Sequence, residues 1–188
     1  MKYQLTKTSI VFCFRKLYRI QALKDLPEIG VKAGDLGGWI EDESNLSQDG
    51  NAWVFGNAWV FGDARVFGDA RVFGNARVFG NTRVSGDAQV FGDAEVFDAR
   101  VFGNAQVFGN AWVFGDAEVF DDARVFGDAR VSGNAWVFGD ARVFGNTRVF
   151  DDAWVFGDAR VFGNAWVYGN ARVSGDAEVF DDAQVIAL

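Results

Sequence analysis

The chain has 188 residues, a formal net charge of −8 at pH 7 and no histidine. Its length suits one elongated domain with a small additional segment. The acidic balance disfavours binding to the phosphate backbone of nucleic acids, although stacking of single-stranded bases on Trp and Phe beside Arg stays open. The single cysteine, Cys13, excludes an internal disulfide and fits a reducing compartment, so we expect a cytoplasmic protein.

Residues 1–50 predict a small β-rich cap, because they carry short alternating apolar patterns and no strict repeat. Strands are expected near residues 10–14 and 18–23. A turn is expected around the glycines of residues 34–38, whose spacing matches neither the P-loop nor the dinucleotide fingerprint. The apolar run at residues 9–14 is too short to span a membrane, so we expect no membrane partner.

Residues 51–188 repeat one six-residue phrase, G-[D/N]-A-x-V-F, 23 times. Val and Phe favour extended backbone, whereas Gly followed by Asp or Asn tolerates the left-handed conformation of a corner. Each unit therefore predicts a four-residue strand, Ala-x-Val-Phe, and a two-residue corner. Side chains alternate along a strand, and the x site carries Arg, Trp, Gln or Glu. We therefore expect Ala and Val inside, with the x residue and Phe outside.

A period of six does not match the α-helix, but three such units close one coil of a solenoid. The sequence thus predicts an all-β, single-stranded, three-sided β-helix over residues 51–188, with between seven and eight coils. Ile40 and Leu46 lie six residues apart, so degenerate entry coils are expected to begin within the cap. The corner at Asp98 lacks one residue, which predicts a tightened turn.

The strict six-residue period of aliphatic and small residues resembles the hexapeptide-repeat left-handed β-helix superfamily, which includes acyltransferases and γ-class carbonic anhydrases. The cap resembles more closely the uncharacterised YdcK-like proteins of bacteria and prophages. The segments that carry this second resemblance are LYRIQAL at residues 17–23, GDLGGWIE at residues 34–41 and NLS at residues 45–47. A left-handed coil is what the resemblance implies, although the unit also fits the right-handed helix of bactofilin-like filaments.

The residue types present argue against the chemistry of those enzyme families. Without histidine, the chain lacks the general base of the acyltransferases and the zinc ligands of the carbonic anhydrases. Glu95, Glu118 and Glu178 are expected on three different faces, so they form no carboxylate pair. We therefore predict no catalytic, cofactor-binding or metal-binding residues. A calcium-binding ladder of corner Asp side chains is an alternative to the simpler role of Asp and Asn as residues that accept the left-handed corner.

The outward rows of Phe, Trp and Arg predict an interaction surface, because monomers seldom expose large apolar patches. We expect a non-catalytic rod that self-associates laterally or end to end through a C-terminal coil without a cap, or that docks a protein partner. The alternatives are a divergent transferase with a ligand site between subunits and an acidic mimic of nucleic acid that blocks a basic partner. The candidate interface residues are Trp112, Trp136, Trp154, Trp166, Phe180, Val185, Ile186 and Leu188.

Overall fold

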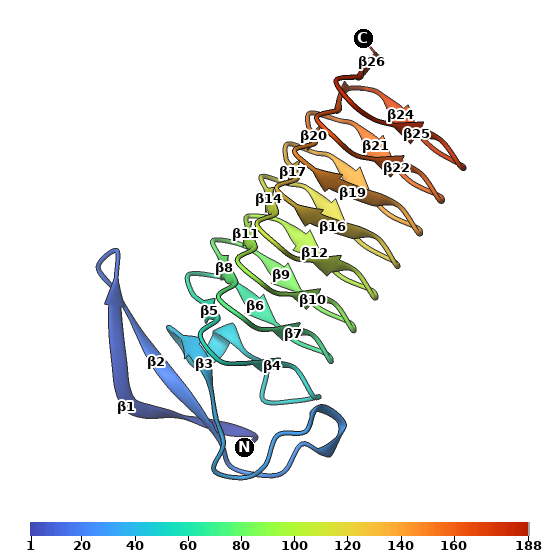
Figure 1. The fold of residues 1–188 in the computed structure, drawn as a ribbon. Helices are drawn as coiled ribbons and strands as arrows, with labels where there is room; N and C mark the ends of the chain where they lie inside the picture. Colours follow the sequence, from blue (N-terminus) through green and yellow to red (C-terminus); the bar gives the residue numbers. More distant parts are fainter. Residues whose placement is uncertain (188) are drawn as a thin grey trace.

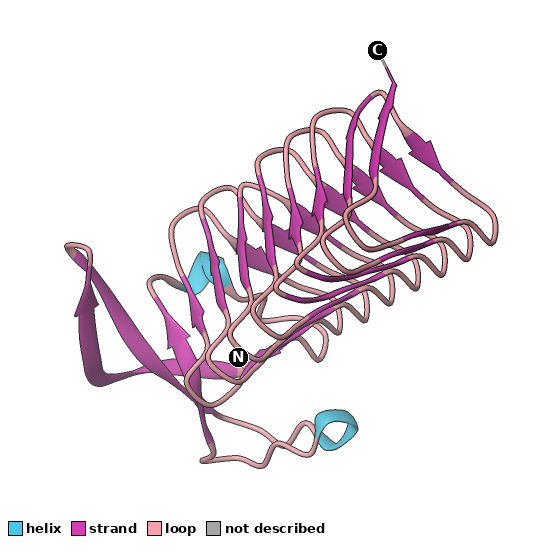
Figure 2. Ribbon diagram, turned by 45° about the horizontal axis from the view of Figure 1, so that its top comes forward, coloured by secondary structure: helices cyan, strands magenta, loops and turns pink. Residues whose placement is uncertain are grey.

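The computed structural model describes residues 1–187, which form a β-solenoid with a β-hairpin at its N-terminal end (Figure 1). The repeats supply 23 strands, β4 to β26, which stack coil upon coil in three parallel sheets. The corners of successive coils lie above one another along the stack (Figure 2). The prediction of an all-β, three-sided solenoid is confirmed.

Two of the three sheets consist only of repeat strands, and the third also contains the hairpin. The eight-stranded sheet contains β4 (Trp53–Val54), β7 (Arg71–Val72), β10 (Gln89–Val90), β13 (Gln106–Val107), β16 (Arg124–Gly127), β19 (Arg142–Gly145), β22 (Arg160–Val161) and β25 (Glu178–Val179). The seven-stranded sheet contains β6 (Arg65–Val66), β9 (Arg83–Val84), β12 (Arg100–Val101), β15 (Glu118–Val119), β18 (Trp136–Val137), β21 (Trp154–Val155) and β24 (Arg172–Val173). The eleven-stranded sheet contains β1 (Tyr3–Phe12), β2 (Arg15–Ala22), β3 (Leu36–Ile40), β5 (Trp59–Val60), β8 (Arg77–Phe79), β11 (Glu95–Phe97), β14 (Trp112–Phe114), β17 (Arg130–Val131), β20 (Arg148–Val149), β23 (Trp166–Gly169) and β26 (Gln184–Ala187).

The predicted strand length is wrong for most units, because the majority of repeat strands have only two residues, x and Val. The chain begins to bend immediately after Phe, since three corners must fit into each coil. Two hydrogen bonds recur along the units and join neighbouring coils: the amide of the x residue donates to an Ala carbonyl, and the amide of Phe donates to a Val carbonyl. In one unit these are Gln89 N to Ala105 O at 2.9 Å and Phe91 N to Val107 O at 3.0 Å. At many corners the amide of Asp or Asn donates a third.

The left-handed corner residue is the first of the corner pair, not the Asp or Asn that follows it. The corner glycines have positive φ, as at Gly92 with 72°, and so do the aspartates that replace glycine, as at Asp121 with 58°. A Cβ on Gly92 would also lie 3.0 Å from the backbone nitrogen of Gly109 in the next coil. Glycine is therefore favoured here both by its conformation and by the close approach of the coils.

The shortened corner at Asp98 is absorbed without a change of face. Asp98 adopts φ 51°, the role that Gly has elsewhere. Its Oδ1 accepts the amide hydrogen of Asn81 at 2.8 Å, whereas the regular corner at Asn75 uses the carbonyl of Gly92 at 2.8 Å. A side-chain oxygen thus replaces the missing backbone acceptor, and the parallel pairing of the valines continues on both sides of the deletion.

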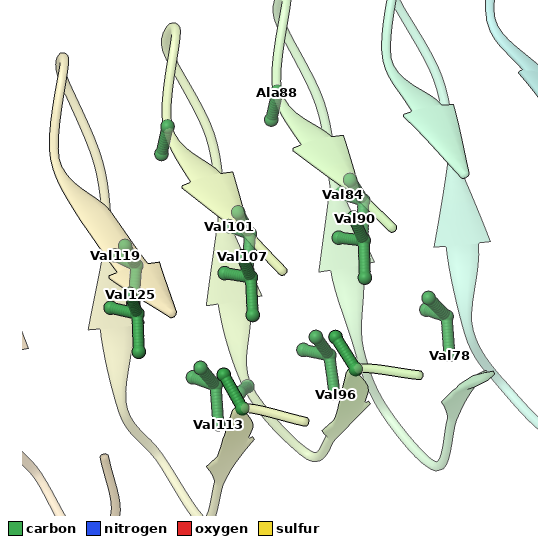
Figure 3. Close-up of a cluster of buried hydrophobic side chains, with 14 of the residues drawn as sticks. Val78, Val84, Ala88, Val90, Val96, Val101, Val107, Val113, Val119 and Val125 are labelled. Atoms are coloured by element: carbon green, nitrogen blue, oxygen red, sulfur yellow. The ribbon is translucent and has the colours of Figure 1, made fainter. Parts of the chain in front are cut away.

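The interior consists of the Ala and Val columns, as predicted. Val78, Val90 and Val107 in the middle of the solenoid are 0% exposed, and the Ala residues beside them are equally buried. Figure 3 shows successive valines of the three sheets pointing into one narrow shared space. Thr82 and Thr147 take Ala positions and are also completely buried.

The N-terminal segment extends the solenoid at its first coil. β1 pairs antiparallel with β2, β2 pairs antiparallel with β3, and β3 runs parallel to β5. Ile40 and Leu46 pair with Val60 and Val66, so they occupy inward positions of an entry coil. Gly38 lies inside β3 rather than at the turn that the sequence suggested. A Cβ there would lie 2.5 Å from Val54 Cγ1, so the packing of the first coil requires glycine at this position.

The ammonium group of Lys2 caps the first coil from within. Lys2 is 0% exposed, and its Nζ donates to the carbonyl oxygens of Ala52 at 2.7 Å, Asp49 at 3.3 Å and Gly50 at 3.4 Å. Burial, together with the charge of Lys24, lowers the pKa of Lys2 from 10.5 to about 8, while Asp49 and Asp69 act in the opposite direction. The group thus satisfies three carbonyls at the cost of its own hydration.

We expect the stability of the chain to rise between about pH 8 and pH 10. The pKa of Lys2 is lower in the folded chain than its ordinary value of 10.5, so the unfolded chain binds more protons in this range. Above pH 10 the opposite effect begins, because burial raises the pKa of the Tyr3 hydroxyl. Urea unfolding at intervals of pH tests this, and the rise should be absent in Lys2→Met. An equal rise in that variant would contradict the role of Lys2.

The two buried threonines should respond in opposite ways to replacement by valine. The Thr82 hydroxyl contacts the carbonyls of Phe79 and Val96, whereas the Thr147 hydroxyl oxygen is buried without a hydrogen-bond partner among the described residues. Thr147→Val should therefore raise the free energy of unfolding by about 1 kcal/mol, and Thr82→Val should lower it by about 1 kcal/mol. Chemical denaturation of both variants measures the difference, and equal changes would show that the hydroxyls are equivalent.

Candidate interaction surface

The outer surface of the solenoid is a set of parallel rows, because equivalent residues of successive coils stack about 4.8 Å apart. Each sheet presents one row of x residues and one row of aromatic residues, and each corner presents a row of Asp and Asn. The rows differ among the three sheets, since every third unit of the sequence falls on the same sheet.

The aromatic row of the eight-stranded sheet is the longest and has no interruption from its second coil onwards. Neighbouring ring centroids lie 4.6–5.4 Å apart, and their planes differ by only 1–17°. The members of this row are Phe73, Phe91, Phe108, Phe126, Phe144, Phe162 and Phe180. Stacking leaves most of these rings half-buried, and Phe180 at the end of the row is 47% exposed.

Serine interrupts the aromatic rows of the other two sheets. On the eleven-stranded sheet, Ser132 separates a stack that ends at Phe114 from one that begins at Phe150. On the seven-stranded sheet, Ser85 and Ser174 lie at the two ends of the stack that runs from Phe102 to Phe156. Each interruption removes one ring from an otherwise continuous row.

The candidate interface residues do not form one patch. Trp112 and Trp166 lie on the eleven-stranded sheet, whereas Trp136 and Trp154 stack on each other at 4.9 Å on the seven-stranded sheet. Trp112 is the most exposed of the four, at 38%. Trp154 is covered in part by a guanidinium group 4.5 Å from its ring centre.

The remaining four candidates lie in the last coil that the structure describes or just beyond it. Phe180 ends the long aromatic row, Val185 is half-buried in β26, and the neighbouring Ile186 is exposed. Leu188 lies outside the described residues. That these seven described residues contact a partner stays a prediction.

Arginines on the sheets lie over aromatic rings. The guanidinium carbon of Arg130 lies 5.1 Å from the ring centre of Trp112, and that of Arg148 lies 4.8 Å from Trp166. Such contacts stabilise the charged group and fix its position. The rings are therefore less available than their outward direction alone suggests.

The ion pairs of residues 1–187 all use glutamates. They join Arg15 to Glu41, Arg77 to Glu95, Arg100 to Glu118 and Arg160 to Glu178, at distances of 2.8–3.3 Å. The three glutamates of the repeats lie on three different sheets, as expected. Within the same residues, no aspartate of the repeats forms an ion pair. Most of the charge on the outer rows is thus left without a partner of opposite sign.

The corner rows are held by side-chain hydrogen bonds between coils. The amide of Asn104 donates to Asp122 Oδ1 at 3.0 Å, and that of Asn110 donates to Asp128 Oδ1 at 2.9 Å. An asparagine in one coil therefore partners the carboxylate of the next. No group of three or more His, Cys, Asp or Glu in residues 1–187 is arranged to hold a metal ion. None of the helices in residues 1–187 is long and apolar enough to cross a membrane.

Comparison with known proteins supports the repeat assignment. The model of the YdcK beta solenoid repeat matches residues 70–86, 123–139 and 153–169. These segments make up 51 of the 188 residues, so the chain is similar to the YdcK solenoid repeat over these coils. Each match is one residue short of the 18 residues that separate hydrogen-bonded corner side chains in successive coils, so each covers nearly one coil. No curated protein matches the chain.

Replacing one ring in the middle of an aromatic row should cost more than replacing a ring at its end. Among the described residues, Phe120 stacks on Phe102 and Phe138 at 4.9 and 4.8 Å, whereas Phe156 stacks on Phe138 alone. We expect Phe120→Ser to lower the free energy of unfolding by about 2 kcal/mol and Phe156→Ser by about 1 kcal/mol. Denaturant unfolding checks this, and an equal cost would show that stacking does not stabilise the rows.

Proposed function

We propose that the chain is a non-catalytic rod that associates side by side with a second copy of itself. The observation that carries the proposal is a row of aspartates that runs directly beside a row of arginines on the eight-stranded sheet. We call these the Asp row and the Arg row. The Asp row consists of Asp122, Asp140, Asp158 and Asp176, and the Arg row consists of Arg124, Arg142 and Arg160.

The two rows are in register and open to solvent. Arg124, Arg142 and Arg160 pair directly in β16, β19 and β22, and each follows an aspartate of the Asp row by two residues. All seven side chains belong to exposed residues. Among the described residues, the only ion pair of these seven is that between Arg160 and Glu178.

Each row stacks like-charged residues on strands about 4.8 Å apart, and the repulsion between them destabilises the isolated rod. A second copy can remove both repulsions at once. If the two-fold axis lies parallel to the rods and between the two rows, each Asp row faces the Arg row of the other copy. The spacings match at every coil, because both rods have the same coil height. Such a self-complementary contact is the usual form of a closed dimer.

The same arrangement disfavours the alternative of an acidic mimic of nucleic acid. A mimic needs an extended surface of one sign, whereas the Asp row has the Arg row two residues away along each strand. The long aromatic row, which includes Phe126 and Phe144, lies two residues further on and would border the contact. Its half-buried rings would add apolar area to the pairing of charges.

Charge reversal tests the contact, with sedimentation velocity as the measurement. The wild-type chain should dimerise at micromolar concentration in low salt, and the dimer should weaken as salt screens the rows. Arg124→Glu/Arg142→Glu and Asp140→Arg/Asp158→Arg should each weaken self-association by about tenfold or more. A mixture of the two variants should form a heterodimer, because the first then presents mainly acidic side chains on these rows and the second mainly basic ones.

The matched control reverses two exposed arginines on another face. Arg65→Glu/Arg83→Glu makes the same change of net charge on the seven-stranded sheet, and it should leave dimerisation unchanged. The proposal fails if the wild-type chain is a monomer throughout the concentration series. It also fails if the control weakens the dimer as much as the Arg-row variant, or if the mixture remains monomeric.

A further inference from the structure

A separate feature of the eleven-stranded sheet is a cavity of about 320 Å³ at the point where Ser132 interrupts the aromatic row. Phe114 and Phe150 lie at its two ends along the rod, and Arg130, Arg148 and Trp166 line its side. This cavity lies on a different sheet from the Asp row and the Arg row. We call it the ring slot.

Along the rod, the ring slot spans the level of one missing aromatic side chain. Ser132 belongs to the same column as Phe114 and Phe150, which lie one coil before it and one coil after it. On the eight-stranded sheet, rings occupy every such level at centroid distances of 4.6–5.4 Å. A planar ring at the level of Ser132 would therefore stack on both neighbours at the spacing that the solenoid already uses.

The side of the slot is basic. Arg130 and Arg148 form no ion pair within the described residues, and both are exposed. Their guanidinium groups are held over Trp112 and Trp166 at 5.1 and 4.8 Å, which fixes them beside the slot. A fixed guanidinium presents paired N–H donors that suit a carboxylate or a phosphate.

One carboxylate also lines the slot, but it is already engaged. Asp151 replaces a corner glycine with φ 61°, and its Oδ2 accepts the amide hydrogen of Gly169 at 3.3 Å. Two arginines against one aspartate leave the lining with an excess of one positive charge. The electrostatic preference of the slot is therefore for an anion.

We infer that the ring slot binds a small molecule with a planar aromatic ring and an anionic substituent. The ring inserts between Phe114 and Phe150, and the anionic group meets Arg130 and Arg148. The inference does not depend on self-association, because it concerns another sheet and other charges. It assigns a binding role to the position of Ser132, the serine that interrupts the aromatic row of this sheet.

Phenyl phosphate and benzyl alcohol, titrated against the full chain and followed by NMR, test this assignment. Phenyl phosphate should bind with a Kd on the order of 1 mM, and benzyl alcohol should bind more weakly because it lacks the anion. Ser132→Phe should abolish binding of both, since it supplies the missing ring. That variant should also melt at a higher temperature than the wild type, so its loss of binding cannot be attributed to unfolding.

Two further variants separate the slot from a general surface effect. Arg148→Gln should weaken phenyl phosphate by about fivefold or more and leave benzyl alcohol unchanged. Ser85→Phe fills an interruption on the seven-stranded sheet and should bind both probes as the wild type does. Retained binding in Ser132→Phe, or equal loss in Ser85→Phe, would overturn the inference.

The fully exposed ring of Phe14, at the tip of the hairpin, is the competing occupant. If Ser132→Phe and Phe14→Ser each abolish self-association in sedimentation, the slot holds the hairpin of a second copy. That outcome would overturn the small-molecule assignment. It would remain distinct from failure of the proposed dimer, which depends on the Asp row and the Arg row.

Discussion

The hydrogen bonds between successive coils are the constraint on which the rest of the molecule depends. A typical unit donates two or three backbone hydrogen bonds to the next coil, and the corner glycines let the coils approach closely enough to form them. The interior that results is so narrow that only Ala and Val fit throughout, with Thr at two positions. Because every coil has the same height, side chains outside must form rows, whether their mutual contact is favourable or not.

Those rows stabilise the rod in one respect and destabilise it in another. Stacked phenylalanine rings bury one another, so the aromatic rows act as an outer layer of packing. Stacked arginines and stacked aspartates repel, and only the arginines next to a glutamate or above a ring are relieved within the chain. The sites proposed for function lie where the rows leave something unsatisfied: two rows of opposite charge side by side, and one missing ring.

The fold class could be predicted from the sequence because Ala and Val recur at the same two positions of every unit. These two positions can only be the buried ones, since the x position carries charged residues. The sequence also placed Glu95, Glu118 and Glu178 on separate sheets, because every third repeat unit falls on the same face of the prism. It did not reveal that strands are two residues long, or that the residue before Asp or Asn takes the left-handed conformation, because both depend on how tightly the corners bend. The Asp row, the Arg row and the ring slot appear only when residues 18 apart are aligned, which hydrogen bonds such as Asn110 to Asp128 establish.

The corner at Asp98 has a consequence for how such a chain can change in length. Loss of one residue there leaves every later unit on its own sheet, because a side-chain oxygen fills the gap. Loss or gain of one complete unit would instead turn the downstream part of the prism by one face. Arg142 would then lie on a different sheet from the residues before the change. The Asp row and the Arg row would both be divided at the point of insertion or deletion. Only the insertion or removal of whole coils, each made of three units, keeps every downstream residue in its row. The surface pattern therefore constrains length changes to multiples of three units.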